Sequence, residues 1–166
     1  MIDRMIRAAR LDPQAYEEVE ADEDATAQAA IIVVLAAIAS GIGAIDGGIG
    51  GVIGLIIAGL LGWVVYAALV YFVGTRLFAT AETSSNVGEL LRTLGFAQTP
   101  RLLLFTGFIP VIGLIIAIIV FVWILFTTMV AIRQALDFST GRAIGTALVA
   151  VLALAIVQIV LYLILG

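Results

Sequence analysis

Long apolar stretches separated by short polar ones make up most of this chain. The longest uncharged stretch lies between Arg101 and Arg133. As one straight helix it would extend ~46 Å at ~1.5 Å per residue, which exceeds the ~30 Å hydrocarbon core of a bilayer. Gly107, Pro110 and Gly113 lie inside it, and proline and glycine break or loosen a helix. The pattern therefore predicts a helical hairpin whose break is at these three residues.

The same apolar pattern predicts five hydrophobic segments. The third is short, and at helical rise it covers only ~18 Å, so whether it crosses the bilayer completely is left open. We expect an all-α polytopic membrane bundle in which the third and fourth segments form a hairpin centred on Pro110. The predicted segments are residues 27–45, 52–74, 98–109, 111–136 and 142–165.

The N-terminal region has a different pattern. Residues 1–10 place apolar side chains at helical spacing beside a face of arginines, which is typical of a short helix lying in the membrane interface. Asp12 followed by Pro13 predicts the start of a second helix. We therefore divide the chain into an interfacial or cytoplasmic region, residues 1–25, and a membrane domain, residues 26–166.

The predicted second helix carries an acidic run, which consists of Glu17, Glu18, Glu20, Asp22, Glu23 and Asp24. Such a run is most often a solvated helix face. Docking of a basic partner protein remains open, and so does weak cation binding, although the run lacks the glycine that a calcium loop needs for its turn.

Small residues follow the first segment. A glycine-dense stretch that begins at Asp46 predicts a tight turn on the water side. In the second segment small residues then recur every four positions, at Gly50, Gly54, Ala58 and Gly62. A face of this kind lets two helix backbones approach closely, so it predicts helix packing. The pattern leaves open whether the partner helix belongs to the same chain.

A polar stretch separates the second segment from the third. Within it, Ser85 or Asn86 is suited to cap a short helix that Gly95 would end. Apolar side chains lie on one side of this predicted helix and Glu89 and Arg92 on the other, which favours a position in the membrane interface.

Composition agrees with a bilayer protein and narrows its chemistry. The chain is 63% hydrophobic and 12% charged, with a mean hydropathy of +1.23. It contains no histidine and no cysteine, which removes the usual general base, thiol nucleophiles and the commonest metal ligands. We expect no catalytic, cofactor-binding or metal-binding residues and no enzymatic activity. The basic residues are sparse arginines, so we also expect no nucleic-acid binding.

The arginines predict the orientation in the membrane. With the hairpin, all of them fall on one side, and the positive-inside rule makes that side cytoplasmic. We therefore expect a multi-pass protein of the cell (inner or plasma) membrane, with a cytoplasmic N-terminus and an extracytoplasmic C-terminus. The residues expected to anchor the cytoplasmic face are Arg76, Arg92, Arg101, Arg133 and Arg142.

The order of motifs resembles the Ypt-interacting protein (Yip) family as found in bacteria. The resemblance rests on GELLRTLGFAQTP (88–100), IPVIG (109–113), Trp123 and AIRQA (131–135). It implies five membrane segments with a cytoplasmic N-terminus. Eukaryotic relatives are associated with Rab-type GTPases, but their long cytoplasmic N-terminal region is reduced here to residues 1–25. The resemblance therefore leaves a GTPase interaction open.

Two classes of function remain. The leading hypothesis is a membrane-organising or protein-interaction scaffold, which would form homo- or hetero-oligomers in the lipid bilayer through small-residue helix faces and bind a cytoplasmic protein at its N-terminus. The alternative is a transporter or channel for ions, small molecules or lipid, which would use the Gly/Pro break to line a cavity.

Overall fold

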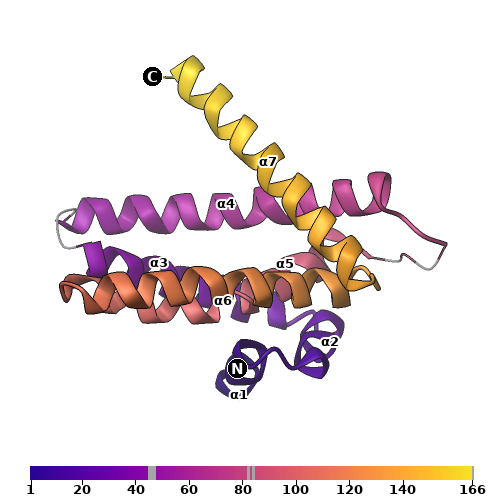
Figure 1. Ribbon diagram of the computed structural model, residues 1–166, viewed down its shortest axis with the longest axis horizontal. Helices are drawn as coiled ribbons and strands as arrows, with labels where there is room; N and C mark the ends of the chain where they lie inside the picture. Colours follow the sequence, from indigo (N-terminus) through magenta and orange to yellow (C-terminus); the bar gives the residue numbers. More distant parts are fainter. Residues whose placement is uncertain (45–47, 82, 84, 166) are drawn as a thin grey trace.

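The computed structural model describes residues 1–44, 48–81, 83 and 85–165, and these residues form helices and their connections, without strands (Figure 1). The all-α fold predicted from the pattern is confirmed. The turn expected at Asp46 lies outside the described residues. In chain order the elements are α1 (Ile2–Ala9), α2 (Pro13–Ala21), α3 (Ala25–Ala44), α4 (Gly48–Leu77), α5 (Val87–Phe96), the 3₁₀ helix η1 (Thr99–Phe108), α6 (Ile112–Ala135) and α7 (Thr140–Leu165).

Four helices are long and apolar enough to cross a membrane: α3, α4, α6 and α7. They correspond to the first, second, fourth and fifth predicted segments, and η1 corresponds to the short third one. The protein is thus a multi-pass helical membrane protein. The bounds differ from the predicted ones by a few residues, and the largest difference is at the start of α4, which begins at Gly48 inside the glycine-dense stretch predicted as a turn. Glycine is tolerated there because a membrane helix keeps its backbone hydrogen bonds internal.

The short third segment runs beside α3 toward the same end of the bundle. Gly95, just before η1, packs against Ala29 near the start of α3, and Gly107 packs against Gly43 near the end of α3. These α3 positions are ~21 Å apart at helical rise. Ten residues of 3₁₀ helix extend ~20 Å because this helix rises ~2.0 Å per residue. A short segment therefore follows most of the length of α3.

Three glycines meet where α3, η1 and α6 end or begin. A Cβ added to Gly107 would lie 2.9 Å from the Gly43 carbonyl oxygen, and one added to Gly113 would lie 2.8 Å from the Gly107 Cα. Pro110 lies in the turn between η1 and α6, as the predicted hairpin requires. Val111, the next residue, has a φ of 67°. A β-branched side chain is strained at positive φ, so the tight turn is maintained by the packing around it.

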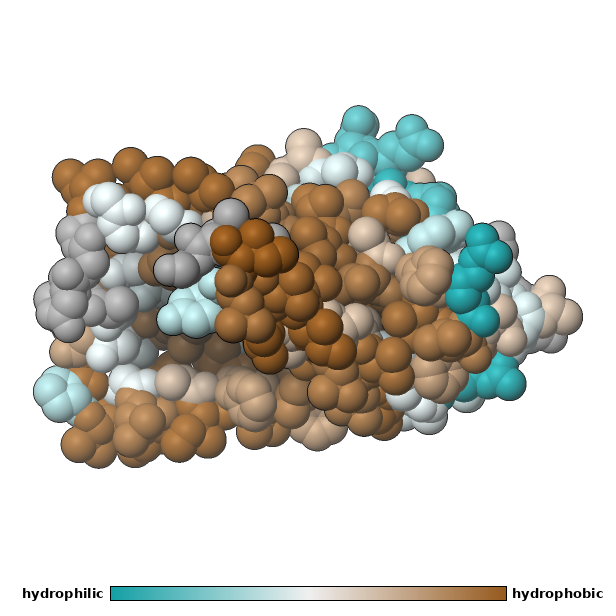
Figure 2. Space-filling model, turned by 90° about the horizontal axis from the view of Figure 1, so that it is seen from above, coloured by the Kyte–Doolittle hydropathy of each residue, from teal (hydrophilic) through white to brown (hydrophobic). Residues whose placement is uncertain are grey.

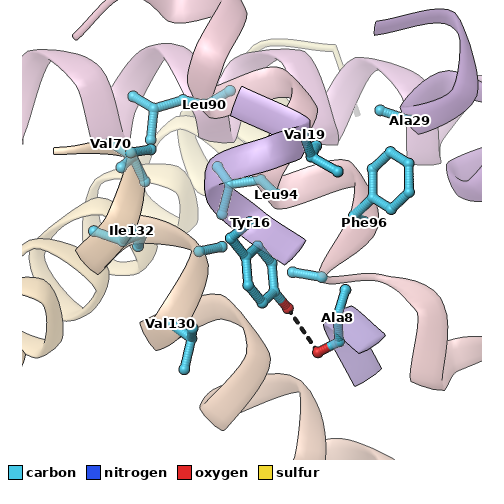
Figure 3. Packing of buried hydrophobic residues seen from close by; sticks show 14 of the residues in the cluster. Ala8, Tyr16, Val19, Ala29, Val70, Leu90, Leu94, Phe96, Val130 and Ile132 are labelled. Atoms are coloured by element: carbon cyan, nitrogen blue, oxygen red, sulfur yellow. Dashed lines mark hydrogen bonds between the residues drawn. The ribbon is translucent and has the colours of Figure 1, made fainter. Parts of the chain in front are cut away.

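The two N-terminal helices fold back onto the membrane domain (Figure 1). Asp12 caps α2 by accepting a hydrogen bond from the Gln14 N–H, as its position before Pro13 predicts. The buried Tyr16 donates its hydroxyl to the Ala8 carbonyl oxygen at 3.1 Å, which joins α2 to α1 (Figure 3). Trp123 in α6 donates its indole N–H to the Ala9 carbonyl oxygen at 2.7 Å. The interfacial region is therefore packed against the bundle.

Helix α5 is a packed element of the core. Its predicted cap is Asn86, which forms a capping box with Glu89. We expected Gly95 to end the helix, but α5 continues for one more residue, to Phe96. Gly95 is a packing position, because a Cβ there would lie 2.5 Å from the Ala29 Cβ. Arg92 is buried, and its guanidinium donates to the Glu20 carbonyl oxygen of α2. It therefore connects two helices, although its position opposite the apolar residues suggested an outward direction.

Helix α7 crosses the bundle obliquely (Figure 1). Its first part packs against α4 and α6, and Ala143, Thr146 and Ala150 are buried there. The second part projects away, and from Ile156 to Val160 every side chain is exposed. The divergence of α7 leaves space between the helices.

Candidate functional site: a groove inside the membrane domain

A groove of about 620 Å³ lies between α3, α4, α6 and α7, with the start of η1 also lining it. Figure 2 shows the apolar surface hollowed beside the projecting end of α7. The volume falls within the range of sites that bind small organic ligands, ~300–1,000 Å³. The groove is therefore large enough for one amphipathic molecule.

Helix packing explains why the groove forms. On one side α3 and α4 are in contact, because the position of Gly59 brings its backbone close to Ala37 and Val33. η1 packs between α3 and α6, which keeps α6 away from α4. Where α7 leaves the bundle it no longer fills the gap between α4 and α6. The groove therefore opens toward the lipid.

The lining is mostly apolar with a few polar side chains. Its polar residues are Ser40, Tyr66, Gln98, Arg101 and Thr128. The Ser40 hydroxyl is used inside its own helix, where it donates to the Ala36 carbonyl oxygen. The Arg101 guanidinium donates to the Gln98 side-chain oxygen at 3.1 Å. Among the described residues Arg101 forms no ion pair, since the salt bridges found there all involve Arg4 or Arg7.

Four of the polar residues lie toward one end of the groove, and Ser40 lies toward the other, next to the Gly41 that packs against Leu55. α3, η1 and α7 run in one direction through the bundle and α4 and α6 run in the other. Gln98 is level with Thr128, because the neighbouring Thr127 hydroxyl reaches the Ala97 carbonyl oxygen. Arg101 lies further along η1 toward the hairpin tip, and its guanidinium donates back to Gln98. The first lining residue of α4, Leu55, is apolar and lies toward the hairpin tip, against Gly41 of α3. The groove is thus amphipathic along its length.

Comparison with known proteins identifies the family. A model of the Yip1 domain matches residues 11–162. The chain belongs to the Yip1-domain family. The match covers α2 to α6 and most of α7, and so it includes every element that lines the groove. No curated protein and no solved structure matches the chain.

The predicted packing face of α4 divides into two parts in this Yip1-domain protein. Gly50 and Gly54 have no atom within 4 Å of an added Cβ, so this part contacts no other described helix. Ala58 and Gly62 line the groove. Contacts with α3 are made by Gly59 and by Val52 and Leu55, all of which lie outside the predicted face. The partner for this face, left open by the sequence, is therefore not found among the described helices of the same chain.

The arginines expected at the cytoplasmic face are placed in different ways. Arg76 and Arg133 are in the last turns of α4 and α6, and Arg142 is in the first turn of α7. These ends lie together in Figure 1, and hydrophilic residues gather at this end of the molecule in Figure 2. The other two differ, because Arg92 is buried under α2 and Arg101 lines the groove. Anchoring by these residues stays a prediction.

Arg101 is the residue whose setting sequence reasoning missed. We placed it at the root of the hairpin, where a long side chain reaches the interface. The structure places it beside α3 and α4 residues from the middle of their spans, such as Ala37 and Gly59. The available signal was the short third segment, because a segment beginning at Gln98 has Arg101 one turn inside it.

The other polar residues of the spans have structural partners or lie elsewhere. The Thr127 hydroxyl donates to a carbonyl oxygen, with Ala97 at 2.9 Å and Trp123 and Ile124 at 3.2 Å as acceptors within reach. Gln158 is exposed on the projecting part of α7 and does not line the groove. Thr128 is thus the α6 polar residue available to a ligand.

Acidic residues form a second, smaller cavity at the interfacial region. It is lined by Glu17, Glu20, Ala21, Glu89, Gln134 and Asp137 and has a volume of about 360 Å³. Burial, together with the nearby carboxylates of Glu89 and Asp137, raises the pKa of Glu20 to about 7. In the part of the chain that the structure describes, no three acidic residues are arranged to hold a metal ion.

Proposed function

We propose that this Yip1-domain protein is a non-catalytic membrane-organising scaffold that binds another transmembrane helix through the first half of α4. The observation that carries the proposal is the open face at Gly50 and Gly54. Helix association in lipid depends on close packing and interhelical hydrogen bonds, and small residues permit that packing. The partner is either a second copy or another membrane protein.

Two further observations support an association role. Gln158 is exposed on a part of α7 surrounded by apolar side chains, and a polar side chain in lipid is stabilised by a partner helix. The protein has no histidine or cysteine to activate a nucleophile, which favours a role without catalysis. We also propose that the N-terminus is cytoplasmic, that the C-terminus is extracytoplasmic and that the membrane is the cell membrane, because Arg76, Arg133 and Arg142 occupy one end of the bundle.

A cytoplasmic partner at the N-terminus would bind the outer surface of α2. Tyr16 and Val19 are buried and are not available to a partner. Glu17, Glu18 and Glu23 are exposed. The partner surface would therefore carry basic residues facing this acidic side.

The scaffold proposal is tested by cross-linking in intact cells. A photoreactive residue at Ile57, which is 54% exposed and borders the open face, should give discrete protein adducts. The double variant Gly50→Leu/Gly54→Leu should lose these adducts and keep its fold, because open space surrounds both positions. Gly141→Leu is the matched control, since Gly141 also has open space and lies in another helix. Adducts with lipid alone in all three proteins would refute the scaffold.

The groove favours a second candidate function, movement of lipid or a small molecule across or within the bilayer. Open access from the lipid and an irregular 3₁₀ segment beside a cavity are features of such proteins. Flux of labelled lipid or ions in proteoliposomes tests it. Flux that persists when Ala58→Trp narrows the groove would contradict this candidate.

A further inference from the structure

We propose that the groove is a binding site for a single anionic phospholipid, with the lipid phosphate held at Arg101 and an acyl chain extending toward the hairpin tip. This site is separate from the open face at Gly50 and Gly54. The proposal combines three features of the described residues: an unpaired cation, an amphipathic lining and access from the lipid.

The first feature is the unpaired guanidinium of Arg101. A guanidinium has five N–H donors, and among the described residues Gln98 accepts from Arg101 at 3.1 Å while no carboxylate pairs with it. Arg101 is exposed along the groove, and a charged group that faces apolar side chains and lipid is costly unless it is paired. By contrast, Arg7 is matched by Asp12 at 2.8 Å and Glu18 at 2.9 Å. The counter-charge for Arg101 is therefore best supplied by a bound molecule.

The second feature is the lining of the groove, which indicates the class of molecule that can bind there. Tyr66, Gln98 and Thr128 gather with Arg101 at one end, and they add hydroxyl and amide groups that can donate to phosphate oxygens. Arginine is well matched to phosphate because its planar donors can bind two oxygens at once. Leu55 lines the other end, and the Ser40 hydroxyl there is satisfied inside its own helix, so this end suits hydrocarbon. A free anion would leave the apolar end unfilled.

The direction of access agrees with a lipid. The groove opens where α7 departs from the bundle, on the surface that Figure 2 shows as predominantly apolar. The amphipathic helix α1 packs against η1, the element that carries Arg101. Its Ile2 and Ile6 are exposed, at 69% and 47%, as expected for a helix lying in the interface. The element that carries Arg101 therefore lies beside a helix whose exposed apolar side chains suit a lipid environment.

The test measures lipid retained by the full-length protein. The protein is reconstituted in membranes of phosphatidylglycerol and phosphatidylcholine in equal amounts, released in mild detergent and analysed by native mass spectrometry. We expect one retained phosphatidylglycerol and a preference of about tenfold over phosphatidylcholine, which corresponds to ~1.4 kcal/mol. Arg101→Gln should remove the preference, and Arg101→Lys should keep part of it.

Two further variants make the result specific. Ala58→Trp fills the groove from an exposed position and should lower retention of both lipids. Arg76→Gln removes the same charge at the exposed end of α4 and should behave as the wild type. Because Ala58 is not packed in the core, this variant decides the question even if Arg101→Gln fails to fold. Wild-type retention in Ala58→Trp would overturn the site.

The remaining outcomes separate the sources of the anion. Excess inorganic phosphate should leave the retained lipid in place, because hydrocarbon contacts contribute to its binding. Displacement of the retained lipid by phosphate would contradict lipid binding and would favour a free anion as the ligand. An equal preference for phosphatidylglycerol in the wild type and in Arg101→Gln would overturn the role of Arg101. A transmembrane helix cross-linked at Ala58 in place of lipid would show that a protein occupies the groove.

Discussion

The backbone of Gly107 in η1 lies directly against the backbone of Gly43 in α3. A side chain has no room between them, because a Cβ on Gly107 would approach the Gly43 Cα to 3.1 Å and its carbonyl oxygen to 2.9 Å. This contact aligns the hairpin with the first span, and it determines where η1 places Arg101.

Gly107→Ala should therefore destabilise the protein by about 1–3 kcal/mol, since two backbones would have to separate. The measurement is the thermal midpoint of the purified protein in detergent. Gly54→Ala is the control, because open space surrounds Gly54 and its substitution should leave the midpoint unchanged or slightly raised. Equal effects at the two positions would contradict the packing seen at Gly107.

Trp123→Phe should release α1 from the bundle. The change removes the indole donor to the Ala9 carbonyl oxygen, a contact of 2.7 Å, and keeps an aromatic ring. The expected loss is ~0.5–1.5 kcal/mol, which should appear as faster trypsin cleavage in α1, at Arg4 and Arg7. Trp63→Phe is a matched control, because Trp63 donates to Leu91 and holds α5 instead. Faster cleavage in both variants would show general loosening.

Arg92→Met should detach α2 from α5. The buried guanidinium donates through two nitrogens to the Glu20 carbonyl oxygen, and methionine keeps much of the volume without the donors. Hydrogen bonds from charged groups contribute ~1.5–3 kcal/mol, so we expect a loss of that size in unfolding free energy. Hydrogen exchange of α2 amides should rise. Arg76→Met, which removes an arginine at the exposed end of α4, is the control and should leave those amides protected.

Stability should fall as pH rises from about 4.5 to about 7. Burial raises the pKa of Glu20 from 4.5 to about 7, so in this range the folded protein binds more protons than the unfolded chain does. Because the folded state binds more protons, the free energy of unfolding decreases as the pH rises, until Glu20 is ionised in the folded protein as well. Thermal midpoints across this range test the expectation. Glu20→Gln should flatten the profile, and an unchanged slope in that variant would assign the effect to other groups.

The predicted orientation is also testable. Alkaline phosphatase fused after residue 166 should be active, because that enzyme folds outside the cytoplasm, and a green fluorescent reporter fused there should be dark. The reverse should hold for fusions in the polar connection at Thr83. Activity of phosphatase at Thr83 would reverse the topology.

Much of the fold can be predicted from the sequence, because it depends on interactions between residues close together in the chain. Apolar length requires membrane helices, since unpaired backbone groups are excluded from lipid. Asp12 and Asn86 mark helix starts because their side chains accept backbone N–H groups of the next turn, and both caps are present. Pro110 breaks the helix because it cannot donate.

Other parts of the fold depend on contacts between residues far apart in the chain and could not be predicted from the sequence. Gly95 has the appearance of a helix end, but Ala29, far away in sequence, makes it a packing position inside α5. Arg92 was assigned to the polar side of an amphipathic helix. Only the position of α2 shows that this side faces the Glu20 carbonyl oxygen, to which the Arg92 guanidinium donates. Helical spacing describes the faces of one helix and says nothing about which neighbour covers each face.

The sequence by itself determined that this is a membrane protein, and it determined its membrane segments, its hairpin and its family. Hydropathy, proline and helix capping are properties of one segment and do not depend on its neighbours. The tertiary structure alone decided that Arg101 faces a groove, that Gly50 and Gly54 have no partner helix among the described residues, and that α7 diverges from the bundle. Arg101 reaches the groove because η1 packs between α3 and α6. A cavity is the space that several helices fail to fill together, so it has no signature in any single one of them.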